Sequence, residues 1–165
     1  MIQVIVDDLA LIQADAVIRP TDEILNPISE VTSRLDQKAG PRFAEQRRLS
    51  ATLKAGSAVV TGSGDLPAPF VLHVVIRDSD SGVRRDLVRR ALQSAWERAK
   101  DWELGVIAAP PVGVGGGGLS LEEAATLMAE TFPAGDDQHC PFELNIIVEQ
   151  ESDRELVEAI VRRMT

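Results

Sequence analysis

The 165-residue chain is predicted to fold as an α/β sandwich with a mixed, largely parallel central sheet. Two observations predict this class. Short apolar runs rich in β-branched residues alternate along the chain with amphipathic segments of helical spacing, and turn residues separate them. The length and the composition, 44% hydrophobic and 26% charged, suit one globular domain over residues 1–165.

Six segments are expected to be strands, because each is a short apolar run bounded by turn residues. They cover residues 2–6, 14–18, 58–61, 70–76, 106–109 and 144–148. The second is expected to end at Arg19-Pro20, where extended geometry before a proline leads into loop-like residues. His73 interrupts the apolar run of the fourth, and we expect it to be a core histidine rather than a catalytic base.

Five segments carry apolar residues at helical spacing. They cover residues 29–39, 42–53, 84–102, 121–132 and 153–164. The apolar stripe of the longest one is expected to include Trp102, and that of the last one Leu156. Ser120 followed by Glu123 is the signature of a capping box at the start of the fourth helix.

Charge and composition exclude several classes of protein. The net charge of −9 disfavours nucleic acid and anionic membranes as partners. A single cysteine, Cys140, excludes an internal disulfide and a cysteine-based zinc cluster, and we expect no metal and no cofactor. No targeting or membrane-spanning segment is evident, so the expected location is the cytoplasm.

The most informative motif is the glycine-rich segment 110–118, which follows a buried strand and precedes the capped helix. Glycines let backbone N–H groups turn toward an anion, and a helix start adds partial positive charge. The segment lacks the Lys-Ser/Thr of a P-loop, and its spacing does not match the dinucleotide fingerprint. Phosphate binding and a turn that merely requires positive φ are both open on this evidence.

Five motifs in order make the chain resemble the macro domain, the ADP-ribose-binding module. They are Val6-Asp7-Asp8-Leu9 with Ala14–Asp22, Lys38-Ala39-Gly40-Pro41, Gly56–Thr61, Leu66-Pro67 with Leu72–Val75, and the glycine-rich segment. The resemblance implies a three-layer α/β/α sandwich. It also implies a ligand site made of Asp8, Leu9, Asp22, Gly113, Val114, Gly115, Gly116, Gly117, Gly118 and Leu119.

The resemblance assigns a role to several of these positions. Asp8 matches the family aspartate that accepts a hydrogen bond from the adenine amino group, and the loop 113–118 matches the diphosphate loop. Asp22 stands where the family has the asparagine that holds the distal ribose and serves catalysis in hydrolytic members. Val114 stands where the family often has a hydroxyl side chain, so that contact is absent.

Other matched positions depart from the family. Arg19 replaces another asparagine, and Ile28-Ser29-Glu30 replaces three glycines of the loop beside the distal ribose. The aromatic positions beside the ligand fall on Leu119 and near Gln150. The distal-ribose half of the pocket and the stacking aromatics are therefore not kept, although the diphosphate loop is.

Three functions follow from these matches. The first is a divergent, non-catalytic module that binds ADP-ribose or a related nucleotide diphosphate. The second is a macro-type ADP-ribosyl hydrolase or deacetylase, with Asp22 or Glu30 acting as base. The third is an interaction or oligomerisation protein on a macro scaffold whose pocket has degenerated. The expected partner is ADP-ribose or a similar small nucleotide, and homo-oligomerisation is open.

Overall fold

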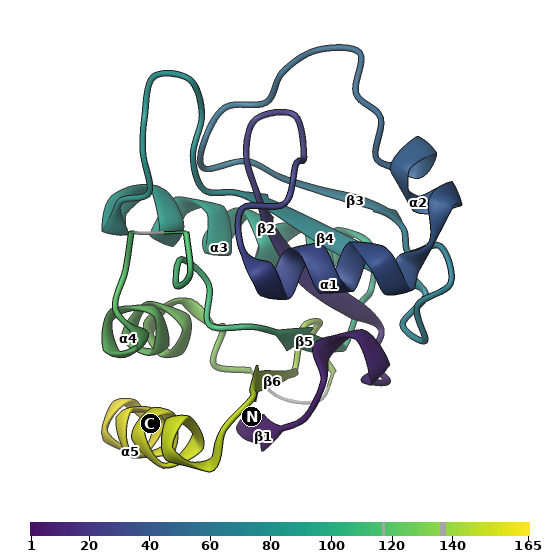
Figure 1. Ribbon diagram of the computed structural model, residues 1–165. Coiled ribbons are helices and arrows are strands. Elements are labelled where there is room, and N and C mark those ends of the chain that lie inside the picture. Colours follow the sequence, from purple (N-terminus) through teal and green to yellow (C-terminus); the bar gives the residue numbers. More distant parts are fainter. Residues whose placement is uncertain (117, 136–137) are drawn as a thin grey trace.

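The computed structural model describes residues 1–116, 118–135 and 138–165, and within these it shows a six-stranded sheet (Figure 1). The strands lie in the order β1 (Ile2–Val6), β6 (Glu143–Val148), β5 (Val106–Ala109), β2 (Ala16–Thr21), β4 (Phe70–Val75) and β3 (Ala58–Gly62). Neighbouring strands are parallel except β3, which pairs antiparallel with β4. The expected mixed, largely parallel sheet is confirmed.

Helices cover both faces of this sheet (Figure 1). On one face, α1 (Glu30–Ala39), α2 (Pro41–Gln46) and the 3₁₀ turn η1 (Leu9–Leu11) contribute Leu35, Phe43 and Leu9 to a buried cluster. On the other face, α3 (Arg85–Asp101), α4 (Leu121–Thr131) and α5 (Glu151–Met164) share a larger cluster with the strands. The chain is therefore a three-layer α/β/α sandwich with a core on each side of the sheet.

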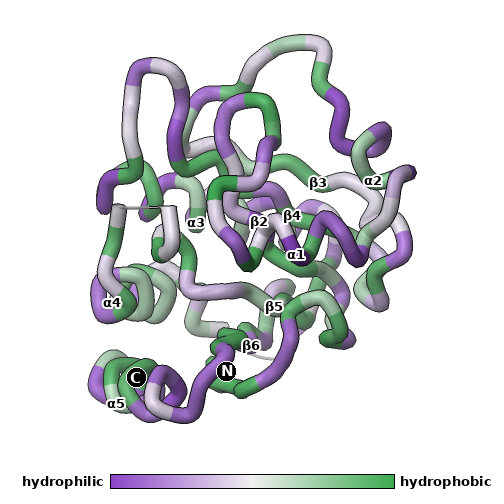
Figure 2. Tube along the Cα trace, in the orientation of Figure 1, coloured by the Kyte–Doolittle hydropathy of each residue, from purple (hydrophilic) through white to green (hydrophobic). Residues whose placement is uncertain are grey.

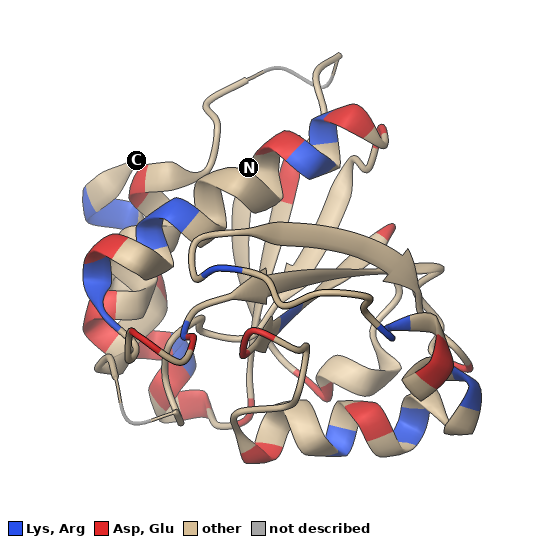
Figure 3. Ribbon diagram, turned by 90° about the horizontal axis from the view of Figure 1, so that it is seen from above, with Lys and Arg blue, Asp and Glu red and all other residues tan. Residues whose placement is uncertain are grey.

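Polar and apolar residues separate by element. The strands near β4 and β6 are mostly hydrophobic, whereas α1 is mostly hydrophilic (Figure 2). Charged residues lie on the helices and loops, and the strands are almost free of them (Figure 3). No helix within the described residues is both long enough and apolar enough to cross a membrane.

Strand β2 is longer than predicted, because it continues through Arg19-Pro20 to Thr21. The expectation that it ends at the proline is wrong. Strand β5 pairs with β2 only at Ala16 and Val17. Pro20 lies beyond that ladder, so its missing N–H leaves no hydrogen bond with β5 unmade.

The predicted helix over 42–53 is also wrong in extent, since α2 ends at Gln46. Beyond it the backbone N–H of Leu53 donates to the carbonyl of Glu23 at 2.8 Å, which holds the following segment against the β2–α1 loop. Two expected core residues differ as well. Trp102 and Leu156 are exposed, and Trp96 is the buried aromatic of α3.

Candidate functional site

A cavity of about 450 Å³ opens at the carboxyl-terminal edge of the parallel strands, and we call it the strand-end cavity. Residues at or after the ends of β1, β2, β5 and β6 line it, together with residues of α1 and α5. Ligands of parallel α/β sheets bind at this edge, outside the strand ends. Its apolar lining includes Leu9, Pro20, Val31, Pro111, Ile147 and Val148.

The glycine-rich segment forms one wall through Val114 and Gly115. Gly113 and Gly115 have φ of +100° and +86°, values that side-chain-bearing residues rarely adopt. The N–H of Leu119 donates to the carbonyl of Gly113 at 3.0 Å and closes the loop. A methyl group at Gly113 would lie 2.7 Å from Cδ1 of Leu119, so this glycine is required by both conformation and space.

Backbone donors on this loop are open to a ligand. Among the described residues, none accepts a hydrogen bond from the N–H of Gly115 or Gly116, whereas the N–H of Val114 donates to Pro111 at 3.4 Å. The start of α4 is less open, because Ser120 and Glu123 form the expected capping box. An anion here would be held by loop amides more than by the helix end.

The predicted loop residues do not all line the cavity. Gly113, Gly116, Gly118 and Leu119 lie on the same loop but are not part of the lining, and Gly117 lies outside the described residues. Leu119 packs against the core beneath the loop. Leu121, the first residue of α4, lines the cavity instead.

Asp8 and Leu9 come directly after β1. Leu9 is buried and lines the cavity, and Asp7 does so too. The Oδ1 atom of Asp8 accepts from the N–H of Ala10 at 2.9 Å and caps η1. Asp8 is exposed and does not itself line the cavity, and its second carboxylate oxygen has no partner among the described residues.

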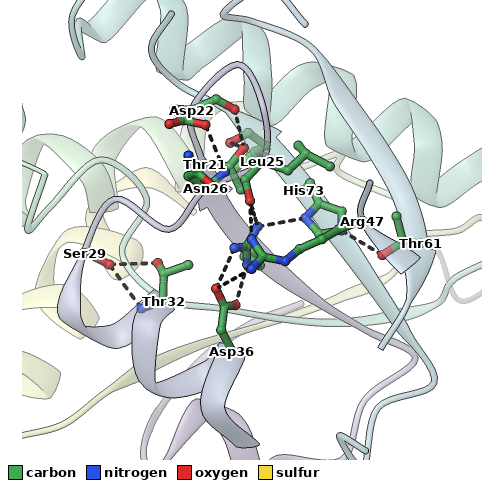
Figure 4. Close-up of polar contacts among 12 residues, drawn as sticks. Thr21, Asp22, Leu25, Asn26, Ser29, Thr32, Asp36, Arg47, Thr61 and His73 are labelled. Atoms are coloured by element: carbon green, nitrogen blue, oxygen red, sulfur yellow. Dashed lines mark hydrogen bonds and ion pairs between the residues drawn. The ribbon is translucent and has the colours of Figure 1, made fainter. Parts of the chain in front are cut away.

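Asp22 lies in the β2–α1 loop and does not line the cavity. Its Oδ1 atom accepts from the N–H groups of Ile24 at 3.0 Å and Asn26 at 2.9 Å (Figure 4). The carboxylate therefore stabilises a local turn. The structure does not bring Asp22 together with Asp8 and the glycine loop.

Two charged residues that sequence reasoning missed face each other at the cavity. Arg34 of α1 and Glu149, which follows β6, both line it and form an ion pair. They lie 115 positions apart, and no local pattern signals the pairing. Among the described residues that line the cavity, Arg34 is the one basic residue, and the acidic ones are Asp7, Glu30, Glu149 and Asp153. The charged side chains of the lining therefore oppose an anionic ligand, which would depend on Arg34 and the loop amides for binding.

Beneath the β2–α1 loop lies a buried polar cluster that includes Asp36 and His73 (Figure 4). Its centre is Arg19, which is fully buried. Its Nε and Nη2 atoms donate to both carboxylate oxygens of Asp36 at 2.7 Å. Its Nη1 atom donates to the carbonyl of Leu25 at 2.7 Å and lies 3.2 Å from Nδ1 of His73. Arg19 occupies the first asparagine position of the resemblance, so side chains fill this part of the site.

His73 is a core histidine within this cluster. Thr61 Oγ1 lies 2.7 Å from its Nε2 atom, and the ring of Phe43 stacks on it at 5.8 Å. Burial and the neighbouring guanidinium of Arg19 hold the pKa of His73 well below its usual value. The ring is therefore neutral near pH 7. His73 is not among the residues that line the strand-end cavity.

The macro domain family model matches residues 18–128, about two thirds of the chain. The chain belongs to the macro domain family. Among its relatives, an uncharacterized protein of Aeropyrum pernix is 32% identical over 120 residues, and the match covers 72% of this chain and 63% of the relative. The O-acetyl-ADP-ribose deacetylase 1 of Pantoea vagans is 29% identical over 145 residues, covering 84% and 82%.

Solved macrodomains share the fold. A variant of the Oceanobacillus iheyensis macrodomain with ADPR superposes with a TM-score of 0.83 at 19% identity, covering 98% of this chain and 91% of that one. The Trypanosoma brucei macrodomain in complex with ADP gives 0.82 at 21% identity, covering 97% and 68%. The three-layer sandwich expected from the resemblance is confirmed.

In this macro domain the glycine loop touches the segment that replaces the family's three glycines. A methyl group at Gly116 would lie 3.5 Å from both Cδ1 and the carbonyl oxygen of Ile28. One at Gly115 would lie 3.3 Å from Cβ of Ser29. The gap between the two loops is therefore narrow at both glycines, and of the two it is Gly115 that lines the strand-end cavity.

Proposed function

We propose that this macro domain binds ADP-ribose or a related nucleotide diphosphate and does not hydrolyse it. The observation that carries the proposal is the strand-end cavity, bounded by a glycine loop whose N–H groups at Gly115 and Gly116 have no acceptor among the described residues. Such amides bind phosphate oxygens well, and family membership adds weight.

The proposed ligand lies with its base near β1 and β6. The free carboxylate oxygen of Asp8 accepts from the adenine amino group, and Leu9, Val148 and Gln150 contact the ring. Gln150 lines the cavity where the family resemblance places a stacking aromatic, so we expect weak binding of the base. The phosphates lie at Gly115, within reach of Arg34.

The proposal of no hydrolysis rests on Asp22, whereas Glu30, the other candidate base, lines the cavity and is the residue that a hydrolase would use. The carboxylate of Asp22 is engaged by two backbone N–H groups outside the cavity and is poorly placed to activate a water there. The alternative, a hydrolase or deacetylase, is favoured by the name of the Pantoea relative. Incubation with an ADP-ribosylated protein and with O-acetyl-ADP-ribose, followed by mass spectrometry, should show no product. Turnover would overturn this part of the proposal alone.

Binding is tested by calorimetric titration of ADP-ribose and ADP. Val114→Glu places a negative charge in the cavity wall without the strain of replacing a glycine, and it should abolish the heat of binding. Leu156→Glu is the matched control, because Leu156 is 42% exposed on α5 and should tolerate the same charge. No binding by the unmodified protein at millimolar ligand would refute the proposal.

A second candidate is a macro scaffold with a degenerate pocket that serves self-association. The close approach of Ile28 to Gly116 and the acidic lining favour it. Light scattering coupled to size exclusion decides whether a defined oligomer forms when ADP-ribose does not bind. In either case we propose one domain over residues 1–165 in the cytoplasm, with neither nucleic acid nor membranes as partners, as the charge of −9 suggests.

A further inference from the structure

A second concave surface lies between the β2–α1 loop and the segment that follows α2, and we call it the Arg47 pocket. Its volume is about 420 Å³, within the usual range of small-molecule sites. The polar or charged side chains in its lining are Asn26, Arg47, Arg48, Ser50 and Thr52, and no acidic residue of the described part of the chain lines it. In a chain with a net charge of −9, a pocket with two arginines and no carboxylate is an unusual local field.

Arg47 carries a positive charge that its neighbours do not balance. Arg47 and Arg19 share one carboxylate, that of Asp36, whose Oδ2 atom lies 2.7 Å from Arg19 Nη2 and 3.7 Å from Arg47 Nη2. Both guanidinium groups also donate to the carbonyl of Leu25, at 2.7 Å and 2.6 Å (Figure 4). Among the described residues, the two guanidinium groups share this one ion-pair partner, the carboxylate of Asp22 acts on Arg47 from farther away, and Arg48 adds a third positive charge beside them.

The donors of Arg47 are not all used. Its Nε atom is buried without a hydrogen-bond partner, and a buried guanidinium donor left unpaired is costly. Burial and the field of Arg19 lower the pKa of Arg47, whereas Asp36 and Asp22 act in the opposite direction. Because the net effect is a lowered pKa, the charged form of Arg47 is less stabilised here than it would be in water.

The backbone beside Arg47 offers further donors. Within the described residues, no acceptor is found for the N–H groups of residues 49–52, and none for the hydroxyls of Ser50 and Thr52. Ile24 and Leu49 form an apolar border to the same pocket, and Ile24 is 51% exposed. Guanidinium, amide and hydroxyl donors next to exposed apolar side chains suit a phosphate ester.

We propose that the Arg47 pocket binds the dianionic phosphoryl group of a small phosphomonoester, at a site separate from the strand-end cavity. The two sites share no lining residue and are flanked by the same loop, residues 22–29. Arg47 and Arg48 neutralise the two charges of the phosphoryl group, and Ile24 and Leu49 contact the body of the ester.

Calorimetry or ³¹P NMR with inorganic phosphate and phenyl phosphate tests the proposal. Both should bind, and phenyl phosphate should bind at least threefold more tightly because it also contacts the apolar border. Arg48→Ala should weaken both at least fivefold without loss of folding, since Arg48 is exposed. Arg47→Gln should do the same, with circular dichroism and a thermal melt to verify the fold.

Arg42→Ala is the matched control. Arg42 lies on α2 near the pocket, its side chain is 76% exposed, and it pairs with Asp65 at 3.6 Å outside the lining. The Arg42→Ala variant removes the same charge as Arg48→Ala and should change the affinity for either phosphate probe less than twofold. Three results would each overturn the proposal: no phosphate binding, equal losses in Arg42→Ala and Arg48→Ala, or a loss in Val114→Glu with full binding in Arg48→Ala. Equal affinity for the two probes would overturn the assignment to an ester.

Discussion

The two walls of the strand-end cavity are built in different ways. The glycine-loop wall, residues 110–119, presents backbone N–H groups and small residues, and its shape depends on positive φ at Gly113 and Gly115. The opposite wall rests on the β2–α1 segment, residues 19–36, where side chains and ion pairs replace small family residues. A site made of backbone tolerates divergence of its surroundings, because the groups that bind do not depend on side-chain identity.

The stability of the side-chain wall depends on a buried ion pair, whereas the glycine-loop wall contains none among its described residues. Arg19 is fully buried and depends on one carboxylate, that of Asp36, and removing one partner of a buried ion pair leaves an uncompensated charge. The remodelled wall should therefore be the more sensitive of the two in stability, and the glycine wall the more sensitive in binding. The following four changes test that difference.

Asp36→Asn should have the largest effect. It keeps the shape of the side chain but removes the carboxylate that, among the described residues, alone pairs with Arg19, so the free energy of unfolding should fall by about 3–5 kcal/mol. Urea denaturation measures it. Asp65→Asn is the control, because Asp65 is 62% exposed in its pair with Arg42. A loss below 1 kcal/mol in Asp36→Asn would show that the cluster is not a buried ion pair.

Gly113→Ala should cost roughly 2 kcal/mol, from positive φ and from contact with Leu119, and should also weaken ligand binding. Gly116→Ala is the matched control. Its φ lies outside the left-handed region, and the nearest atoms of Ile28 lie at an ordinary 3.5 Å. Similar losses of stability in the two variants, measured by denaturation, would contradict the account of the loop.

The buried Arg19 cluster that supports the side-chain wall should also respond to pH, through His73. The pKa of His73 is well below 6.5 in the folded protein, so below pH 6.5 the unfolded chain binds a proton that the folded one does not. Stability should fall as the pH drops through this window, with a slope from this group approaching about 1.4 kcal/mol per pH unit. His73→Gln should lose that slope, whereas His139→Gln should keep it. An unchanged slope in His73→Gln would assign the effect elsewhere.

Local patterns in the sequence predicted most of the fold and one wall of the site. The strands, the stripe of α3, the capping box at Ser120 and the glycine loop all follow from spacing within about ten residues. The pair of Arg19 with Asp36 depends on how β2 and α1 pack, 17 positions apart. The pair of Arg34 with Glu149 spans 115 positions and exists only because α1 meets the end of β6. Local sequence patterns therefore indicate the glycine-loop wall, but they do not indicate ion pairs between residues that are distant in the sequence.

Glu149→Gln gives the smallest effect and the sharpest comparison between the walls. It removes one acidic group from the cavity and releases Arg34 for a ligand phosphate. Both side chains are about half exposed, 51% and 54%, so solvent screening limits the gain, and ADP-ribose should bind about threefold to fivefold more tightly by calorimetry.

Glu155→Gln is the control for this change, because it removes the same charge from the exposed surface of α5 outside the cavity. It should leave affinity within twofold. The double variant Arg34→Ala with Glu149→Gln should lose the gain, since the benefit depends on a freed guanidinium. A gain that persists without Arg34 would mean that the acidic field alone opposes the ligand, and that the glycine-loop amides hold the phosphates without help from the side-chain wall.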